Sequence, residues 1–280
     1  MSSRSTSSAR NRPWRLGVAA LVLLAGGAAD AGAGTQADTI RYPYVSAFSR
    51  VTGENRVYFC GGTLIAPRWI LTAAHCFHDR SGGRISNEDV WAEAGAGVLH
   101  EVPDAAQVRI ARIVIHPDYD PATQANDIAL VRLASEAGPL IAPIARGGRE
   151  VGAATILGFA SFYEGRLAAN ALDRHGRLTA QLSDRMRQAR VVRIPPRQCA
   201  ARLDVGGQAT GAFQICAGAS PDDACIGDSG GPLMVEGADR VDRLAGIVSF
   251  GSGCAVAAPV TVYTRVSAYA AWIGGVVAGR

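Results

Sequence analysis

Short β-type segments recur along this chain of 280 residues and are separated by turns rich in Gly, Pro and Asp. Runs of this kind, dominated by Val, Ile, Thr and aromatic residues, are typical of strands. Nowhere do they alternate with helices in the way that a parallel sheet requires. The sequence therefore predicts an all-β protein, and its clearest strands are residues 108–115, 127–133, 154–160, 243–250 and 260–266.

One helix is expected, over residues 267–277 at the C-terminus. Tyr269, Ile273, Val276 and Val277 recur there at helical spacing, and Ser267 is the expected N-cap. Gly274 and Gly275 lower the helical propensity of its middle. We therefore expect a short helix that docks on the rest of the protein.

The first 31 residues have the features of a signal peptide. A basic stretch is followed by the short apolar run LGVAALVLLAGGAA, and Ala29-Asp30-Ala31 fits a cleavage site, with Gly27-Ala28-Ala29 as a competitor. The run falls short of the roughly 20 apolar residues that cross a bilayer. We predict export to the extracellular space or periplasm without a membrane anchor.

The net charge of the chain does not favour binding of a polyanion. All 28 cationic side chains are arginines, against 24 acidic residues, for a formal charge of +4. Removal of residues 1–31 takes away four arginines and Asp30, which leaves 24 against 23 and a charge of +1. A nucleic acid or an acidic membrane is therefore not an expected partner.

Six cysteines lie beyond residue 31, and an even number in an exported chain predicts three disulfides. Spacing alone leaves 15 pairings open. No C-x-x-C, Cys/His or C-x-x-C-H spacing indicates zinc or haem, so we expect no required metal and no cofactor. The cysteines are Cys60, Cys76, Cys199, Cys216, Cys225 and Cys254.

Ser229 lies in Gly227-Asp228-Ser229-Gly230-Gly231, which fits the G-x-S-x-G pattern. The α/β-hydrolases use this pattern with a triad in the order serine, acid, histidine. The five histidines here, at positions 75, 78, 100, 116 and 175, all precede Ser229. That order excludes the standard α/β-hydrolase arrangement, and a general base must come from upstream.

His75 in ILTAAHC and Asp127 in NDIALVRL are the candidate partners of Ser229. A carboxylate at the head of a buried strand would orient the imidazole and stabilise its protonated form when Ser229 gives up a proton. A serine in a Gly-rich stretch is by itself more often a turn residue, but these partners favour a nucleophile. Of the other histidines, we expect His78 to be a solvated loop residue and His116 a structural turn residue, and His175 has no evident partner.

Four motifs in order now identify a resemblance. CGGTLIAPRWILTAAHC, NDIALVRL, CIGDSGGPL and VSFGSGC followed by VYTRV are similar to the successive motifs of trypsin-like serine proteases of the chymotrypsin family. The match runs from about Tyr42 to the C-terminal helix. It implies a protease domain over 32–280, built as two packed six-stranded antiparallel Greek-key β-barrels over roughly 42–145 and 146–266, before the terminal helix.

The resemblance also implies roles for individual residues. Ser229 would be the nucleophile, His75 the general base and then acid, and Asp127 the orienting carboxylate. The backbone N–H groups of Gly227 and Ser229 would form the oxyanion hole. The implied disulfides are Cys60–Cys76, Cys199–Cys216 and Cys225–Cys254.

The resemblance gives two opposing indications of which substrate side chain the specificity pocket accepts. Asp223 would lie at its base and pair with Arg or Lys of the substrate, and Gly251 would leave one wall open, with Ser249 close to Asp127. Thr261, however, stands where trypsins carry glycine and should narrow the pocket. We expect cleavage after Arg or Lys, with a pocket for small residues as the alternative; Asp223 as part of an acidic surface loop is the plainer interpretation.

The start of the chain departs from the family pattern. Family members pair a new Ile-Val terminus with the aspartate before the serine, here Asp228, whereas residues 31–34 read AGAG. The protein is therefore either an active secreted endopeptidase, acting on proteins or peptides and open to proteinaceous inhibitors, or a low-activity homologue that works by binding. We expect a monomer, with 161–181 as a long surface loop.

Overall fold

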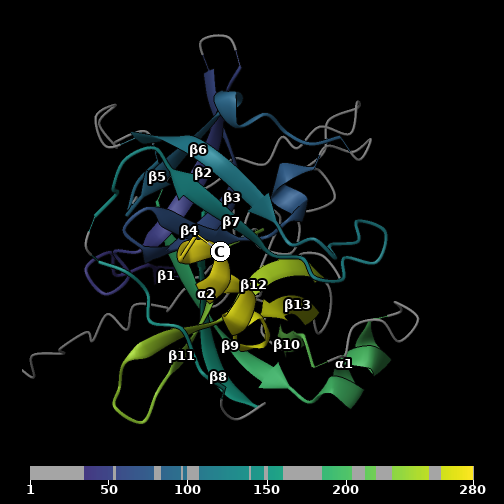
Figure 1. The fold of residues 1–280 in the computed structure, drawn as a ribbon. Helices are drawn as coiled ribbons and strands as arrows, with labels where there is room; N and C mark the ends of the chain where they lie inside the picture. The colour runs from purple at the N-terminus through teal and green to yellow at the C-terminus, as the bar shows by residue number, and fades with distance from the viewer. Residues whose placement is uncertain are drawn as a thin grey trace, which may run out of the picture. The chain divides into compact units, whose positions relative to one another are not determined.

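The structure is a computed structural model that describes the chain from residue 35 to residue 279 with several gaps (Figure 1). Contacts divide the chain into residues 1–31 and 32–280, and all described residues belong to the second unit. The described ranges are 35–52, 55–78, 83–95, 97–99, 107–138, 140–147, 151–159, 185–203, 212–218, 229–251 and 260–279.

The first barrel is a closed ring of six antiparallel strands in the order β2-β3-β4-β7-β6-β5. Short apolar segments form it, and in β7 the sequence ALVRL buries every residue except Arg132. The strands are β2 (Val45–Thr52), β3 (Asn55–Ala66), β4 (Trp69–Thr72), β5 (Val90–Ala94), β6 (Gln107–Ile115) and β7 (Ala129–Leu133).

The second barrel is formed by β8-β9-β10-β13-β12-β11, which closes because β8 pairs with both β9 and β11. The short strand β1 (Thr35–Gln36) joins the edge of β9. The ring contains β8 (Gly152–Gly158), β9 (Arg187–Ile194), β10 (Gln214–Gly218), β11 (Pro232–Glu236), β12 (Asp242–Gly251) and β13 (Val260–Arg265).

The two barrels share part of one hydrophobic core. Leu157, Phe159 and Met234 of the second half pack in the same buried cluster as the strands of the first. The rings of Tyr58 and Phe159 meet edge to face at 5.6 Å. The prediction of two packed six-stranded antiparallel barrels is confirmed, and the five expected strands match β6, β7, β8, β12 and β13 to within two residues at each end.

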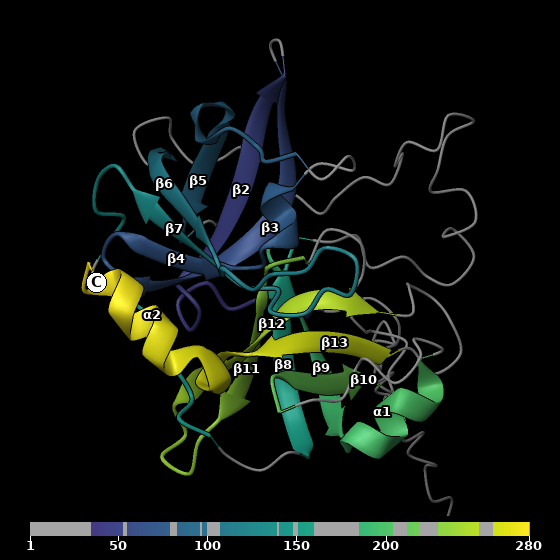
Figure 2. The same cartoon turned by 45° about the vertical axis from the view of Figure 1, so that its right-hand side comes forward.

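The C-terminal helix is confirmed, but its predicted N-cap is wrong. A 3-10 turn, η5 (Val266–Tyr269), follows β13 directly, and α2 (Ala270–Val277) begins after it with no side-chain cap. Ser267 lies inside that turn, which occupies the positions expected for the first helical turn. Figure 2 shows α2 running from the end of β13 toward β4. The ring of Trp272 in α2 contacts that of His116, with centroids 5.0 Å apart and planes tilted by 54°.

The other helical segments are short. They are the 3-10 turns η1 (His75–Phe77) and η2 (Asn87–Asp89) and the helix α1 (Pro196–Arg202). None of the helices within the described ranges has the length and apolar character needed to span a bilayer.

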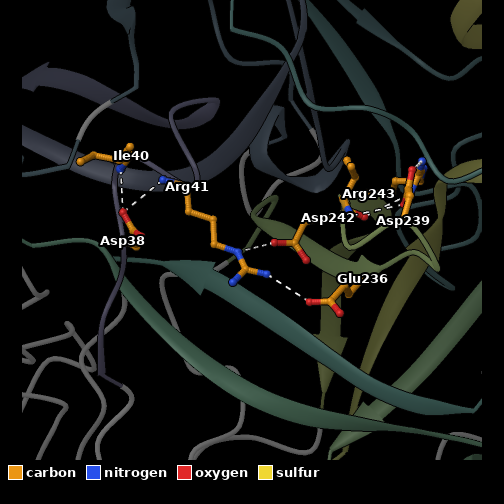
Figure 3. Close-up of polar contacts among 8 residues, drawn as sticks. Asp38, Ile40, Arg41, Glu236, Asp239, Asp242 and Arg243 are labelled. Carbon is orange, nitrogen blue, oxygen red and sulfur yellow. Dashed lines mark hydrogen bonds and ion pairs between the residues drawn. The ribbon is translucent and has the colours of Figure 1, made fainter.

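The N-terminal segment 35–44 is fastened to the second barrel before the chain enters the first. Asp38 Oδ1 accepts hydrogen bonds from the backbone N–H groups of Ile40 and Arg41 at 2.9 and 3.1 Å, which forms a turn. Arg41 then donates from Nε to Asp242 Oδ2 at 2.6 Å and lies 3.4 Å from Glu236 Oε2 (Figure 3). An ion pair of the second barrel therefore holds this segment in addition to the β1–β9 pairing.

We predict that Arg41→Gln lowers the free energy of unfolding by about 0.5–1 kcal/mol. Arg41 is half exposed, so solvent screens the pair, and the value lies in the range of partly exposed ion pairs. Chemical denaturation at low and high salt measures the loss, which should shrink as salt rises.

Arg240→Gln is the matched control, because Arg240 lies in the neighbouring β11–β12 turn with an exposed side chain. It should change stability by less than about 0.5 kcal/mol. Equal effects of the two substitutions at both salt concentrations would contradict a specific role for Arg41.

Candidate active site

Strand register brings His75 and Asp127 together. β4 and β7 are antiparallel partners, with Thr72 opposite Ala129. His75 follows the end of β4 by three residues, and Asp127 precedes the start of β7 by two. Because the end of one strand lies beside the start of its antiparallel neighbour, the two side chains meet at one rim of the first barrel.

Asp127 contacts His75 through both carboxylate oxygens. Asp127 Oδ1 accepts the backbone N–H of His75 at 2.9 Å, and Oδ2 lies 2.8 Å from Nδ1 of the imidazole. Asp127 is completely buried, whereas the His75 side chain keeps 22% of its surface exposed. An ionised carboxylate only accepts hydrogen bonds, so the neutral imidazole carries its proton on Nδ1 and leaves Nε2 as the basic nitrogen.

The second barrel supplies further donors to Asp127. Ser249 Oγ, from β12, donates to Asp127 Oδ2, and Thr264 Oγ1, from β13, donates to the main-chain carbonyl of Asp127 at 2.7 Å. Removing a carboxylate from water is costly unless hydrogen bonds replace its hydration. The buried charge is thus stabilised by residues of both barrels.

The shifts in pKa follow from this arrangement. Burial alone would raise the pKa of Asp127, but the charge and hydrogen bond of His75 and the hydroxyl of Ser249 outweigh it, and the net shift is downward. Burial lowers the pKa of His75, and attraction to Asp127 with its hydrogen bond more than reverses that effect, so the pKa lies above its usual 6.5. Each group therefore favours the charged form of the other.

Ser229 is fixed by backbone contacts to both barrels. Its carbonyl accepts the N–H of Gly61 in β3 at 2.8 Å, and the N–H of Gly230 donates to Val248 O in β12 at 2.9 Å. Gly230 has φ +78°, and a Cβ there would lie 2.2 Å from Thr72 Oγ1. Only glycine readily adopts this left-handed conformation and also leaves room for the close approach of Thr72.

The disulfide Cys60–Cys76 links the surroundings of His75 and Ser229. Cys76 follows His75, and Cys60 precedes Gly61, whose N–H binds the carbonyl of Ser229. The Cys199–Cys216 disulfide joins α1 to β10. Both predicted pairings are confirmed, whereas Cys225–Cys254 lies outside the described residues.

Three other site predictions also fall outside the described residues. They concern Gly227 of the oxyanion hole, Asp223 at the base of the pocket and Asp228 as the partner of the terminus. The loop 161–181 and the leader 1–31 likewise lie outside them.

Gly251 and Thr261 are opposite one another in the β12–β13 ladder. Thr261 is 5% exposed, and a Cβ on Gly251 would lie 3.0 Å from its Oγ1. Thr261 therefore occupies part of the space that glycine at 251 leaves open. Phe250, between Ser249 and Gly251, packs partly against a second-barrel cluster that contains Val260 and Val262.

The remaining described histidines have structural surroundings. His116 accepts the N–H of Asp118 on Nδ1 at 3.2 Å, in agreement with the predicted turn, and it contacts Tyr269. The prediction of a solvated His78 is wrong, because its ring lies 5.3 Å from that of Tyr119 and both ring nitrogens are buried.

Among the described residues, the one group with the spacing of metal ligands is Cys60, His75 and Cys76. The two sulfur atoms are already joined in a disulfide. A thiolate is the form of cysteine that binds a metal, so this group is not a ligand set.

Several residues that hold Asp127 in place could not be predicted from the sequence. Asn126 has φ 56°, and its Oδ1 accepts the hydroxyl of Tyr269 at 2.9 Å, while Thr264 binds the carbonyl of Asp127. An asparagine before the strand was the one local signal, since Asn tolerates the left-handed region. The partners Thr264 and Tyr269 are more than 130 residues away and carry no such signal.

The sequence is similar to one family model and to several known proteins. The family model described as Trypsin matches residues 32–273. The chain is 35% identical over 251 residues to coagulation factor XII of Sus scrofa, covering 83% of this chain and 37% of that protein. It is 36% identical over 230 residues to serine protease 56 of Mus musculus, with 76% and 34% covered. The chain thus spans about a third of the length of these relatives.

A third relative corresponds more closely in length. The venom peptide isomerase heavy chain of Agelenopsis aperta is 31% identical over 232 residues, which cover 77% of this chain and 86% of that protein.

We predict that Asp127→Asn moves the pKa of His75 from above 6.5 to below it. The substitution removes the charge that raises the pKa and leaves the burial that lowers it. NMR titration of the imidazole resonances measures both midpoints.

His116 is the internal control, because its lowered pKa follows from burial, with only Asp118 opposing. Its midpoint should stay in place when Asp127 is changed. An unchanged His75 midpoint in the variant would contradict the assignment of Asp127 as the dominant partner.

Proposed function

Because this chain belongs to the trypsin family of serine proteases, we propose that it is a secreted serine endopeptidase. Its substrates are proteins or peptides, cleaved through an acyl-enzyme intermediate. The observation that carries the proposal is the buried Asp127 in contact with both the backbone and the Nδ1 of His75, next to the segment that holds Ser229.

The proposed mechanism assigns one role to each of the three residues. Nε2 of His75 takes the proton of Ser229 Oγ as this oxygen attacks the carbonyl carbon of the scissile bond. The protonated imidazole is stabilised by Asp127 and then gives the proton to the leaving amine. Water then attacks the acyl carbon while Nε2 of His75 takes its proton. The imidazolium returns that proton to Ser229 Oγ as the acyl group leaves.

The charge that forms on the carbonyl oxygen would be held by N–H groups of Gly227 and Ser229. The hydrogen bonds from Gly61 to the carbonyl of Ser229 and from Gly230 to the carbonyl of Val248 support this role, because they restrict the backbone at Ser229. Preorganised donors of this kind contribute about 3–4 kcal/mol each to transition-state stabilisation.

Two disulfides within the described residues support the proposed export. Cys60–Cys76 and Cys199–Cys216 form and persist in an oxidising compartment. Residues 1–31 would direct the chain there and then be removed.

We predict that the mature protein reacts with a fluorophosphonate probe at Ser229. Ser229→Ala should abolish the label and lower peptide hydrolysis by about 10⁶-fold, because the nucleophile is lost. Mass spectrometry locates the label and the mature N-terminus in the same sample.

Ser86→Ala is the control, since Ser86 caps η2 at the surface. A folded mature protein that never labels at Ser229 would contradict the endopeptidase proposal and favour a homologue that acts by binding. Labelling without peptide hydrolysis would also contradict it, and an isomerase assay would then apply, given the relative from Agelenopsis aperta.

For the specificity pocket we propose cleavage after Arg or Lys, with Asp223 as the counter-charge. A carboxylate at the base of a pocket selects a cationic side chain because burying it unpaired is costly. Thr261 would limit the width of this pocket, as its position opposite Gly251 indicates.

We predict that Thr261→Gly raises kcat/KM for Arg substrates by about tenfold, because it removes a side chain from the path of the guanidinium. Thr261→Val keeps the bulk and should give no such gain. Ester or amide substrates with Arg, Lys, Ala and Phe measure the preference. Fastest turnover of the Ala substrate by the unaltered protein would contradict Arg/Lys specificity.

A further inference from the structure

The backbone just before Asp127 has a conformation that most side chains disfavour. Asn126 has φ 56°, in the left-handed region, which asparagine tolerates better than most residues but does not prefer. The N–H of Ile128 donates to the carbonyl of Asn126 at 2.8 Å, so Asp127 is the central residue of a three-residue turn. The direction in which the Asp127 side chain leaves the backbone therefore depends on the conformation of Asn126.

The side chain of Asn126 is held at both ends of its amide group. Nδ2 donates to the carbonyl of Asp118 at 2.8 Å, and Oδ1 accepts the hydroxyl of Tyr269 at 2.9 Å. A main-chain carbonyl only accepts hydrogen bonds, so Nδ2 must face Asp118, and the hydroxyl of Tyr269 must be the donor to Oδ1. A residue of the same loop and a residue 143 positions away thus fix one side chain.

The other hydrogen bonds to Asp127 act on Asp127 itself. Ser249 and His75 bind its carboxylate, and Thr264 binds its carbonyl. Within the part of the chain that the structure describes, none of these three residues bonds to the side chain of Asn126. The conformation of Asn126 therefore needs support of its own.

Tyr269 is a rigid donor to Asn126. The residue is only 4% exposed, and its ring lies 5.2 Å from that of His116 and 5.7 Å from that of Phe213. Burial and the negative charge of Asp127 raise the pKa of Tyr269 to about 12. The hydroxyl therefore keeps its proton at neutral pH, and it lies close enough to Asp127 to respond to that charge.

The C-terminal helix determines where the hydroxyl of Tyr269 lies. Tyr269 is the last residue of η5 and directly precedes α2. Trp272 of α2 contacts the imidazole of His116, and Tyr269 contacts the same ring. His116 directly follows β6 of the first barrel. Packing of the C-terminal segment on the first barrel thus places the donor for Asn126.

We propose that Tyr269 is a positioning residue of the active site. Its hydroxyl holds Asn126 in the left-handed conformation and so directs the carboxylate of Asp127 at Nδ1 of His75. The consequence for catalysis rests on the proposed endopeptidase function, whereas the consequence for the titration of His75 needs no turnover. The C-terminal segment is thereby part of the support of the active site.

Tyr269→Phe tests the hydroxyl alone, because phenylalanine keeps the ring and its packing. Without the donor, Asn126 can relax toward a more favourable φ, and the carboxylate of Asp127 moves away from the imidazole. In the full chain with Ser229→Ala, NMR titration should show a lower pKa of His75, because a more distant carboxylate stabilises the imidazolium less. The Nδ1 proton should also exchange faster with water, because its hydrogen bond is weaker.

Kinetics of the chain with Ser229 intact provide a second readout. Tyr269→Phe should lower kcat for peptide hydrolysis about tenfold and change KM by less than about twofold, because proton transfer depends on the geometry at His75 and substrate binding does not. Tyr44→Phe is the matched control, since Tyr44 is also buried and packs against an aromatic ring, that of Tyr42, near the start of β2. It should change neither the titration of His75 nor kcat.

Asn126→Ala tests whether the hydroxyl acts through Asn126. The substitution removes the acceptor, so it should lower the pKa of His75 and kcat in the same direction as Tyr269→Phe. In the Asn126→Ala background, Tyr269→Phe should then lower kcat by less than about a further twofold, because the interaction is already lost. If one of the two variants does not fold, the titration of His75 in the other decides the proposal.

Three results would each overturn the positioning role of Tyr269. They are an unchanged titration of His75 in folded Tyr269→Phe, an equal shift in Tyr44→Phe, and the full tenfold loss from Tyr269→Phe in the Asn126→Ala background. A shift in the titration of His75, in a protein that hydrolyses no peptide even when unaltered, would support the positioning role and contradict the proposed function alone.

Discussion

The buried charge of Asp127 is the constraint on which the arrangement of the two barrels depends. A carboxylate with no exposed surface requires donors on every side. His75 of the first barrel supplies two, and Ser249 and Thr264 of the second barrel bind its side chain and its carbonyl. If one barrel moved relative to the other, the buried carboxylate would lose some of the hydrogen bonds that replace its hydration, at a cost of several kcal/mol. Asp127 therefore links the geometry of the candidate active site to the packing of the two barrels.

Glycine allows the second close contact between the barrels. The N–H of Gly61 in β3 reaches the carbonyl of Ser229, and a Cβ on Gly230 would enter the space of Thr72 Oγ1 and Gly61 O. A side chain at Gly61 would meet Gly231 at 3.1 Å. Gly230 thus has a steric reason beyond the motif's implied role in catalysis, since a side chain there would force the barrels apart next to the serine.

The sequence predicted those features that depend on neighbouring residues and on ordered motifs. β6, β7 and β12 were visible in their apolar runs, and the order of histidine, aspartate and serine indicated the scaffold. The N-cap at Ser267 was wrong because the chain passes from β13 into a 3-10 turn, a tertiary effect that local propensity does not contain. Thr264 could not be assigned to Asp127, because only the packing of the second barrel on the first brings these distant positions together.

The N-terminal segment separates two events that family members usually combine. In the family pattern, a new terminus both docks on the second barrel and pairs with the aspartate before the serine. Here Thr35 and Gln36 pair with β9, and Arg41 binds Asp242, within residues that follow AGAG. The segment is therefore held on the second barrel by its own strand pairing with β9 and by its own ion pair with Asp242. The absence of an Ile-Val terminus would then bear on the predicted pairing with Asp228 and on the predicted oxyanion hole, and not on this docking of residues 35–44.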